Sequence, residues 1–483
     1  MLGRIVDRLL QPRLSQPFSS ATRRYRPKLS TRLAQAPTPS RLLEVYAKEC
    51  HGFGRLHLAM TANYLGKLRV PSHRYSAHDK QLFAQLTTQL LEHSAELTPR
   101  DLANAVHGLA KVRAPDAVLQ ELAQLFVLSL DPAAFSTTEL VMVVHAFATA
   151  RFAAELSPVF AHAESELLVR LASDADPQHA ANMLWSYATA GAYASPIFDA
   201  VEEYVLSADL AAFKPQELSN VVWSYMRSHV QHSSPVFAAV GAHLAERGLQ
   251  GFTPQNVANV VAAFAKADQP LPDAVLEAAV EHLQRDLPAW LSTPQNTANL
   301  LWALSILEAT HLVDSDAVLR GLSQRLPKLQ LREKCQVHQF MLEAMTATGE
   351  QLHEAHAALF QSTRAAMHSD QDAGRSGFLH SGLARLSAAL AARRIPFDTH
   401  VRTELGYEVD VKLRVAVAAE VRGVVVMIDG PSRFVRRQER GRSLMKKRHL
   451  RAFGYHVVSF PYYELTDAAM DDQLDQIMLL AED

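Results

Sequence analysis

One short phrase recurs along the middle of the chain at a nearly constant spacing. Every copy but one places Asn between apolar positions, and the exception has Met142 there. This Asn column has spacings of 38, 40, 38, 39 and 40 residues and comprises Asn104, Met142, Asn182, Asn220, Asn259 and Asn299. A more degenerate copy lies 41 residues upstream, around Asn63. A period of this size is typical of repeats that each form one supersecondary unit and bury their apolar faces against their neighbours.

The local sequence predicts two helices in each repeat. Most copies follow a capping residue and a proline, which favour a helix start because the missing proline N–H would have no partner there. These pairs are Thr98-Pro99, Asp176-Pro177, Thr253-Pro254 and Thr293-Pro294. Ser136 and Glu139 have the spacing of a capping box. A second amphipathic run follows the phrase, for example at residues 201–206 and 274–280. We therefore expect an α-solenoid of about seven repeats.

Aromatic residues recur inside the phrase and allow two interpretations. They could stack on nucleic-acid bases, but their position in the apolar stripe favours packing between repeats. They are Trp185, Trp223, Trp302, Tyr187 and Tyr225. The Asn column could read base edges, or it could cap or bridge the backbone of the adjacent turn inside the array. We favour the structural role for Asn, because a side chain that is nearly constant between repeats cannot distinguish bases.

Composition excludes several classes of protein. Cys50 and Cys335 are the only cysteines, which excludes a disulfide-framed scaffold and a zinc site built from cysteines. No apolar run approaches the roughly 18–20 residues that a membrane span needs, so we expect no membrane insertion. The chain has no phosphate-binding Gly-rich loop, HExxH or GxSxG motif. We expect no cofactor and no metal site.

The N-terminal residues 1–41 carry nine Arg or Lys residues and one acidic residue, Asp7. Apolar residues at the start fall roughly on one helix face, and several Ser residues follow. This pattern is typical of an organellar import presequence. We expect import into the mitochondrial matrix, with the plastid as the alternative destination. A basic tail that contacts RNA or a membrane surface would have a similar composition.

The predicted secondary structure changes after about residue 375, where strands alternate with helices. We expect helices at residues 378–394 and 443–453, and strands at 399–402, 407–417, 424–428 and 455–460. The chain would then comprise a presequence at 1–41, the solenoid at 42–375 and an α/β domain at 376–483. The predicted fold class is therefore mainly α, with a small α/β domain after the repeats.

A block of positive charge lies in this last domain. Residues 431–451 contain nine Arg or Lys residues and only one acidic residue, Glu439. Such a density of charge favours binding to phosphate. The candidate RNA-binding residues are Arg433, Arg436, Arg437, Arg440, Arg442, Lys446, Lys447 and Arg448. The same block could instead pair with the solenoid, which is acidic, or with a partner protein.

Three ordered stretches of the last domain resemble the RAP domain, a module of RNA-associated proteins in organelles and apicomplexans. They are Ile428-Asp-Gly-Pro-Ser-Arg-Phe434, Leu444-Met-Lys-Lys-Arg-His-Leu450 and Phe453-Gly-Tyr-His-Val-Val-Ser-Phe-Pro-Tyr-Tyr-Glu464. The repeats ahead of it resemble the octotricopeptide- and heptatricopeptide-like helical repeats that commonly precede this domain. The resemblance implies RNA as the partner.

The RAP domain is similar in fold to PD-(D/E)xK endonucleases, which hold a divalent metal between carboxylates. In a nuclease, Asp410 and Asp429 would be the catalytic residues. Met427 replaces the acid often found two positions before Asp429, and Arg433 replaces the usual His. Losing a carboxylate would remove most of the metal affinity, so we expect a binding scaffold with no catalytic residues.

The sequence thus predicts a non-catalytic organellar RNA-binding protein that acts in RNA stabilisation, processing or ribosome assembly or structure. The resemblance makes ribosomal RNA the leading target and mitochondrial ribosomal proteins further candidate partners. Two alternatives stay open: a metal-dependent endoribonuclease, and a scaffold that binds only proteins.

Overall fold

The structure is a computed structural model that describes residues 28–150, 157–228, 235–349, 351–369, 377–415, 421–435 and 437–466, together with Met470, Asp472, Leu474 and Asp475. The chain forms two compact units, residues 1–122 and residues 123–483. Most of the expected presequence, residues 1–27, lies outside the described residues. Among the described helices, none has both the length and the apolar character that crossing a bilayer would require.

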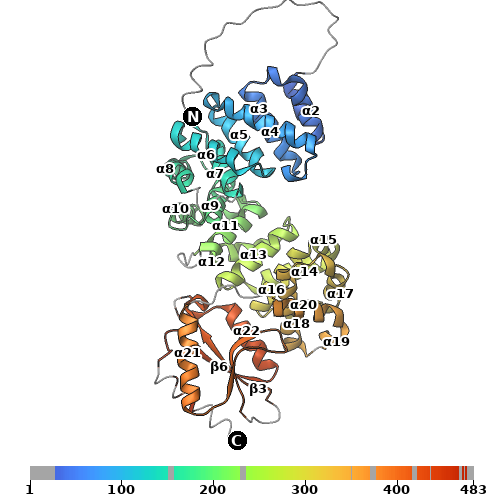
Figure 1. The fold of residues 1–483 in the computed structure, drawn as a ribbon, viewed down its shortest axis with the longest axis vertical. Coiled ribbons are helices and arrows are strands. Elements are labelled where there is room, and N and C mark those ends of the chain that lie inside the picture. Colours follow the sequence, from blue (N-terminus) through green and yellow to red (C-terminus); the bar gives the residue numbers. More distant parts are fainter. Residues whose placement is uncertain are drawn as a thin grey trace, which may run out of the picture. The chain divides into compact units, whose positions relative to one another are not determined.

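The first unit is helical (Figure 1). Its helices are α1 (Leu29–Ala34), α2 (Pro39–Glu49), α3 (Arg55–Leu68), α4 (Ala77–Glu92) and α5 (Pro99–Lys111), followed by the start of α6 (Asp116–Ser129). Gly66 of α3 and Gly108 of α5 let these two helices pack backbone to backbone, because a Cβ on Gly108 would lie 2.0 Å from the Ala62 carbonyl oxygen. Helix α1 and the start of α2 fall inside the range 1–41. Since Leu33 is buried, the packed part of the chain begins before the expected boundary.

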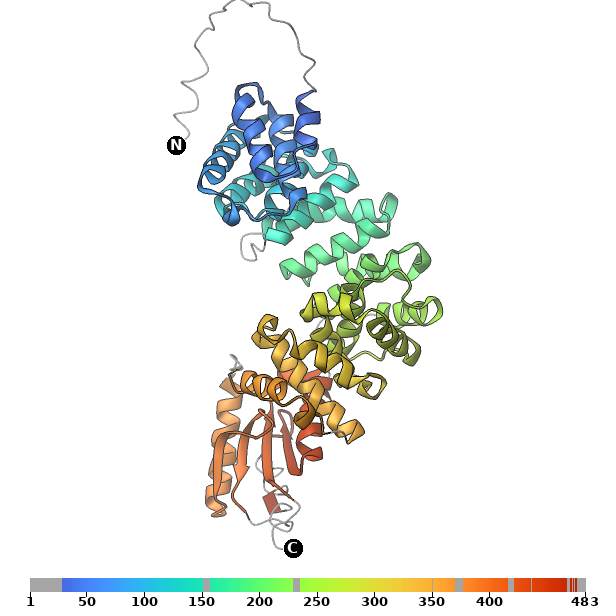
Figure 2. The same cartoon turned by 90° about the vertical axis from the view of Figure 1, so that its right-hand side faces the viewer.

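The second unit begins with the remaining helices of the solenoid (Figure 2). They are α7 (Thr137–Ala150), α8 (Ser157–Ser173), α9 (Pro177–Ala190), α10 (Ile197–Ser207), α11 (Pro215–Ser228), α12 (Val236–Arg247), α13 (Pro254–Ala267), α14 (Asp273–Arg285), α15 (Leu287–Ser292), α16 (Pro294–Ile306), α17 (Ser315–Ser323), α18 (Leu331–Thr348), α19 (Leu352–Ala355) and α20 (Ala357–Ser369). The helices that carry the phrase pack in sequence as α7, α9, α11, α13, α16 and then α18. This arrangement confirms the helical repeats.

Capping and packing follow the sequence with one exception. Thr98, Asp176 and Thr253 each accept a hydrogen bond from the backbone of the first helical turn, as predicted. Thr293 occupies the N-cap position of α16 but makes no such bond, because its backbone is not in the usual extended cap conformation (φ −126°, ψ 84°). Tyr187 is fully buried, and its hydroxyl donates to the Phe160 carbonyl 2.9 Å away, which confirms its packing role.

Two pairs along the Asn column bridge neighbouring repeats through side-chain hydrogen bonds. In the first unit, Asn63 Nδ2 donates to Asn104 Oδ1 at 2.5 Å. In the second unit, Gln336 Nε2 donates to Asn299 Oδ1 at 2.9 Å. Gln336 stands 37 residues after Asn299, so α18 continues the column by one repeat that the sequence pattern did not reveal. These two pairs give Asn63, Asn104 and Asn299 a structural role, although the partners are side chains and not the backbone of an adjacent turn.

An α/β domain follows the repeats. Helix α21 (Gly377–Ala392) precedes a sheet of strand order β1-β2-β3-β6, made of β1 (Phe397–Arg402), β2 (Glu408–Leu413), β3 (Gly423–Asp429) and β6 (Tyr455–Pro461). Strand β2 is antiparallel to β1 and β3, whereas β6 is parallel to β3. A small hairpin of β4 (Phe434–Val435) and β5 (Gln438–Glu439) and the helix α22 (Gly441–Ala452) connect β3 to β6. The expected α/β domain is confirmed.

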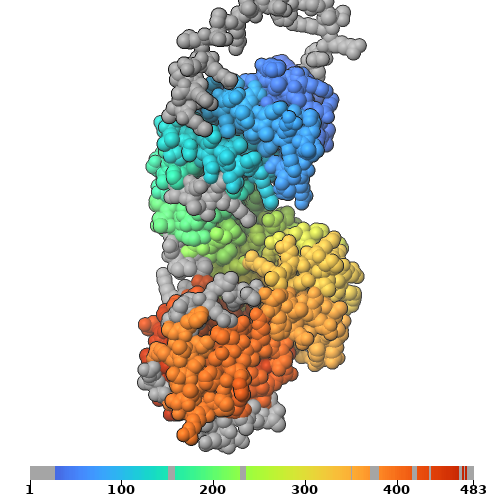
Figure 3. Space-filling view, viewed as in Figure 1, coloured from blue at the N-terminus to red at the C-terminus, as the bar shows by residue number. Residues whose placement is uncertain are grey.

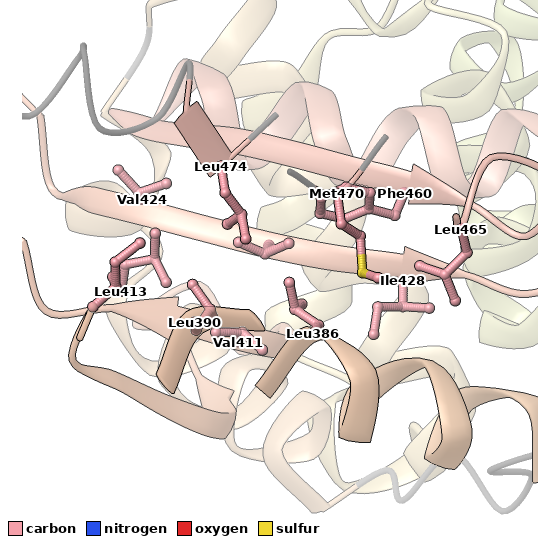
Figure 4. Packing of buried hydrophobic residues seen from close by; sticks show 12 residues of the cluster. Leu386, Leu390, Val411, Leu413, Val424, Ile428, Phe460, Leu465, Met470 and Leu474 are labelled. Carbon is pink, nitrogen blue, oxygen red and sulfur yellow. The ribbon is translucent and has the colours of Figure 1, made fainter. Parts of the chain in front are cut away.

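One face of this sheet forms the core of the domain (Figure 4). Alternate β3 residues Val424, Val426 and Ile428 point to this face, where they meet Leu386 and Leu390 of α21. Because strand side chains alternate, Val425, Met427 and Asp429 point to the opposite face. Helix α22, which packs on β6, covers that second face, so the basic block and Asp429 are brought together.

Candidate nucleic-acid interface

Lys447 of α22 is buried among acidic and hydroxyl groups rather than exposed to solvent. Its Nζ lies 2.6 Å from Asp429 Oδ2, 2.6 Å from Glu439 Oε1 and 2.6 Å from Ser459 Oγ. Two carboxylates and one hydroxyl thus surround the ammonium, and the Ser459 hydroxyl accepts a hydrogen bond from it. Lys447 therefore holds α22 to the ends of β3 and β6, and it does not contribute to an exposed basic surface.

Asp429 is completely buried and has cations on both sides. Arg433 Nη1 lies 2.7 Å from Oδ1, and Ser459 Oγ donates to Oδ2 at 2.5 Å. Burial alone would raise the pKa of Asp429, but the charges of Arg433 and Lys447 outweigh it and lower the pKa below its usual range. The carboxylate is thus ionised and fully occupied by side chains of its own domain.

Asp410, the other residue of the nuclease hypothesis, lies on the neighbouring strand. Val411 pairs with Val426 in the β2–β3 register, which places Asp410 opposite Met427. Asp410 Oδ2 accepts a hydrogen bond from the Ile428 backbone N–H at 2.8 Å. Among the described residues, no three His, Cys, Asp or Glu side chains form a group that could hold a metal ion. These donors do not fit a divalent metal, because Arg433 and Lys447 already neutralise Asp429.

Arg448, the residue after Lys447 on α22, faces the solenoid. Its guanidinium donates to both carboxylate oxygens of Glu343 on α18, at 3.0 Å from Nε and 2.9 Å from Nη2. The same side chain reaches Glu308 Oε1 at 2.8 Å and the Ser305 carbonyl at 2.9 Å. Figure 3 shows the contact between the α/β domain, in orange and red, and the last repeats, in yellow. Arg448 thus joins the domain to the repeats.

His449 completes this junction from inside. Its Nε2 lies 2.6 Å from Glu343 Oε2, and its Nδ1 lies 2.8 Å from the Tyr407 hydroxyl. Burial lowers the pKa of His449, so we assign the neutral ring, with Nε2–H donating to Glu343 and Nδ1 accepting from Tyr407. Burial opposes ionisation of Glu343, but the hydrogen bonds from His449 and Arg448 lower its pKa overall.

Backbone contacts fix the start of α22 against the repeats. The Gly441 N–H donates to Asp268 Oδ1 at the end of α13, at 2.6 Å. A Cβ on Gly441 would lie 2.6 Å from Ile306 Cγ2 of α16. A side chain at position 441 would have to displace Ile306, so the α/β domain and the repeats share one closely packed boundary.

The remaining predicted cations differ in exposure. Lys446 is half-buried, and its Nζ donates to the Glu408 carbonyl at 2.5 Å. Arg440 is half-buried, whereas Arg437 and Arg442 are exposed. Arg436 lies outside the described residues. The structure therefore separates the predicted set into residues that hold the domain together, chiefly Lys447 and Arg448, and residues that present charge to solvent.

Aromatic rings accompany the exposed charge at the carboxyl ends of β3 and β6. The Arg437 guanidinium lies 5.3 Å from the centre of the Tyr463 ring. Tyr463 packs edge-on against Tyr462 and Phe434, with ring centres 5.1 and 5.4 Å apart. The Tyr462 N–H donates to the Asp429 carbonyl at 2.8 Å. We call Arg433, Arg437, Tyr462 and Tyr463 the edge surface.

Neither tyrosine was among the predicted binding residues. The available signal was an aromatic pair directly after a predicted strand. Ligands commonly bind at the carboxyl ends of parallel strands, and β3 and β6 are parallel. Tyr462 and Tyr463 follow that end of β6, which places them next to Arg433 and Arg437.

A second set of aromatic residues lies along the solenoid. Trp185 and Trp223, one repeat apart, are only half-buried and stack with ring centres 6.2 Å apart. His145 stacks on Trp185 from the preceding repeat, at 4.8 Å. The Arg227 guanidinium lies 5.2 Å from the centre of the Trp223 ring. The tryptophans therefore pack between repeats, as expected, and also leave ring surface accessible.

Comparison with known proteins gives two findings. The RAP domain family model matches residues 426–482. A protein of Bos taurus named "FAST kinase domain-containing protein 3, mitochondrial" is 34% identical over 88 residues, which are 16% of this chain and 13% of that protein. The chain therefore matches far less than two thirds of the length of this relative. The matched range of the family model contains β4, β5, α22, β6 and most of β3. This chain carries a C-terminal RAP domain, which is packed on the last repeats of a helical array.

Proposed function

We propose that this protein is a non-catalytic RNA-binding protein of the mitochondrion and that its RAP domain binds RNA through the edge surface. The observation that carries the proposal is the exposed Arg437 guanidinium beside the Tyr463 ring. Guanidinium groups bind phosphate oxygens, and aromatic rings stack on unpaired bases. A surface with both groups suits a single strand, whose phosphates and bases are accessible together.

The charge distribution supports binding at this edge over binding along the whole basic block. Lys447 and Arg448 are engaged in ion pairs within the protein, so RNA would have to displace carboxylates to reach them. Arg433 is partly exposed even though it contacts Asp429. An ionised Asp429 keeps Arg433 at the edge, and phosphate can approach its remaining donors.

The proposed location rests on two observations. Residues 1–41 have the composition of an import presequence, and the bovine relative has "mitochondrial" in its name. We propose the matrix as the compartment, ribosomal RNA as the leading target and mitochondrial ribosomal proteins as further partners. RNA crosslinking and sequencing from organelle extracts, with gradient sedimentation, would test this. Reads from messenger RNA in light fractions would contradict the ribosomal assignment.

The direct test compares three single variants in RNA binding at several salt concentrations. Arg437→Gln should weaken binding to single-stranded RNA and reduce the slope of log affinity against log salt by roughly 0.7 to 1. Tyr463→Ala should weaken binding without changing this slope, because it removes ring surface and no charge. Arg414→Gln is the matched control, since Arg414 is an exposed arginine after β2, at the opposite end of the sheet.

Equal effects of Arg437→Gln and Arg414→Gln would contradict the edge surface. If none of these variants changed RNA binding, a scaffold that binds only proteins would be the better interpretation. Cleavage of RNA that required magnesium and disappeared in Asp410→Ala would contradict the non-catalytic assignment. The occupied Asp429 carboxylate supports binding over cleavage.

A further inference from the structure

The row of aromatic residues along the solenoid is interrupted at one position. Trp185, Trp223 and Trp302 occupy equivalent places in their repeats, and Ala262 occupies that place on α13. The stack between Trp185 and Trp223 therefore ends at Trp223. A row of rings that lacks one member leaves room for a planar group.

A pocket of about 180 Å³ lies at this interruption. Its lining residues come from α11, α13, α16 and α18, and they include Trp223, Ala262, Lys266, Arg332, Glu333 and Gln336. No lining residue comes from α9, so the pocket lies on the side of Trp223 that faces α13. Trp185 belongs to α9 and Arg227 bonds the α9 carbonyl of Ala188, so both lie on the other side.

A buried acceptor in this lining has no partner among the described residues. Gln336 is 5% exposed, and its Nε2 donates to Asn299 Oδ1. Its Oε1 is buried and accepts no hydrogen bond from any described residue. A buried polar atom without a partner is costly, so this oxygen favours a ligand that brings an N–H donor.

Positive charge surrounds the same pocket. Lys266 and Arg332 line it, and the Lys266 ammonium lies 5.4 Å from the centre of the Trp302 ring. Burial, together with the charges of Arg332 and Arg442, lowers the pKa of Lys266 to about 8. Glu333 is the acidic residue in the lining, but its Oε2 accepts the Gln330 N–H at 2.7 Å as part of the α18 cap. The cations are therefore the groups that an anionic ligand would meet.

We propose that this pocket binds one unpaired nucleobase of an RNA strand, stacked on Trp223 in the place that Ala262 leaves open. Gln336 Oε1 accepts an N–H of the base, which all four bases can offer, and Lys266 and Arg332 bind the adjoining phosphate. This inference rests on the proposed RNA-binding function and names a second contact for the same strand, within the array rather than on the edge surface.

The test compares two strands of equal length and charge, a single-stranded oligoribonucleotide and its abasic counterpart. The wild-type full chain should bind the strand with bases roughly 5- to 150-fold more tightly, which is the range of base–aromatic stacking. Ala262→Trp fills the pocket with an indole, and Gln336→Leu removes the acceptor with little change of volume. Both should reduce this preference several-fold and leave the affinity for the abasic strand within about twofold. Leu206→Trp, which adds an indole at an exposed site on α10, should leave both affinities unchanged.

The outcomes separate this inference from the proposed function. A preference for bases that survives in both Ala262→Trp and Gln336→Leu would overturn the pocket. Equal wild-type affinity for the two strands would overturn it as well, together with base stacking on Tyr463, while phosphate binding by Arg437 would stand. If the wild-type chain bound neither strand, the proposed function would fail first. Circular dichroism of each variant verifies the fold, and Gln336→Leu decides the question if Ala262→Trp does not fold.

Discussion

Arg448 of the RAP domain grips Glu343 of the solenoid through two donors, with Nε 3.0 Å from Oε1 and Nη2 2.9 Å from Oε2. Glu343 is 4% exposed and Arg448 is 24% exposed, so the pair is shielded from solvent on the solenoid side. Positive charge in the basic block is consequently used in part to assemble the protein. The amount available to phosphate is smaller than a count of Arg and Lys indicates.

Removing the charge of Glu343 should weaken the packing of the RAP domain on the solenoid. Glu343→Gln leaves the guanidinium of Arg448 partly buried without its main counterion, and breaking a buried pair typically costs about 3–5 kcal/mol. Urea denaturation should show a lower unfolding midpoint for this variant. Glu308→Gln is the control, because Glu308 contacts the same guanidinium but is 66% exposed, and an exposed pair contributes under about 1 kcal/mol. Similar midpoints for the two variants would contradict the assignment of Glu343 as the principal partner.

Acidic pH should destabilise the same junction through His338. The ring is buried between Leu405 and Thr363, and burial, with a contribution from nearby His449, Arg364 and His368, lowers its pKa from 6.5 to about 4. The unfolded chain therefore takes up a proton that the folded protein excludes. The neutral His338 makes its full contribution to the free energy of unfolding above about pH 6.5. This contribution is lost as the pH falls toward 4, and the total loss is about 3 kcal/mol.

The measurement for His338 is the free energy of unfolding at several pH values between 4 and 7. His338→Gln retains a donor for the Leu405 carbonyl and cannot titrate, so its stability should depend less on pH than that of the wild type. Equal pH dependence in the two proteins would show that other groups cause the acid sensitivity.

We expect Lys447 to stabilise the folded protein and not to bind RNA. Lys447→Met leaves the buried Asp429 and Glu439 without their shared ammonium, and we expect a loss of about 3–5 kcal/mol. Thermal denaturation measures this loss. Arg451→Gln is the comparison, because Arg451 is an exposed cation on the same helix and its replacement should change stability by under about 0.5 kcal/mol. If the Lys447→Met variant were as stable as the wild type but bound RNA more weakly, Lys447 would be an RNA-binding residue.

RNA affinity should decrease as the pH rises above about 8, where Lys266 loses its proton. Bound phosphate favours the charged ammonium, so binding becomes coupled to proton uptake in this range. Arg332 and Arg442 face the same position and stay charged, and Glu333 is held in the α18 cap. Lys266→Arg should retain affinity at neutral pH and flatten the decrease, measured at constant ionic strength. An unchanged decrease in this variant would remove Lys266 from the phosphate site.

Much of the fold was predictable because its causes are local. The Asn column and the caps at Thr98, Asp176 and Thr253 repeat a pattern that dictates two helices per unit. The buried run before Asp429 indicated a strand. Gln336 was missed, since its neighbours no longer follow the phrase although it keeps the spacing.

The site was less predictable, because pairing depends on contacts between distant segments. Arg448 and Glu343 are 105 residues apart in sequence, and no local signal indicates that one neutralises the other. Lys447 and Lys446 are adjacent in sequence, yet α22 directs one to Asp429 and the other to the Glu408 carbonyl. Residues from four helices line the pocket beside Ala262. The replacement of Trp by Ala in one repeat was therefore not enough to predict it.

The contact of Gly441 with Asp268 and Ile306 has a consequence for how such proteins diversify. If a RAP domain were fused to a different repeat array, the residues in contact with Gly441 would not be complementary to it. Recombination during evolution should therefore exchange the domain together with the repeats from α13 to α18. Engineers who build chimeras face the same restriction, and the productive junction lies upstream of Pro254.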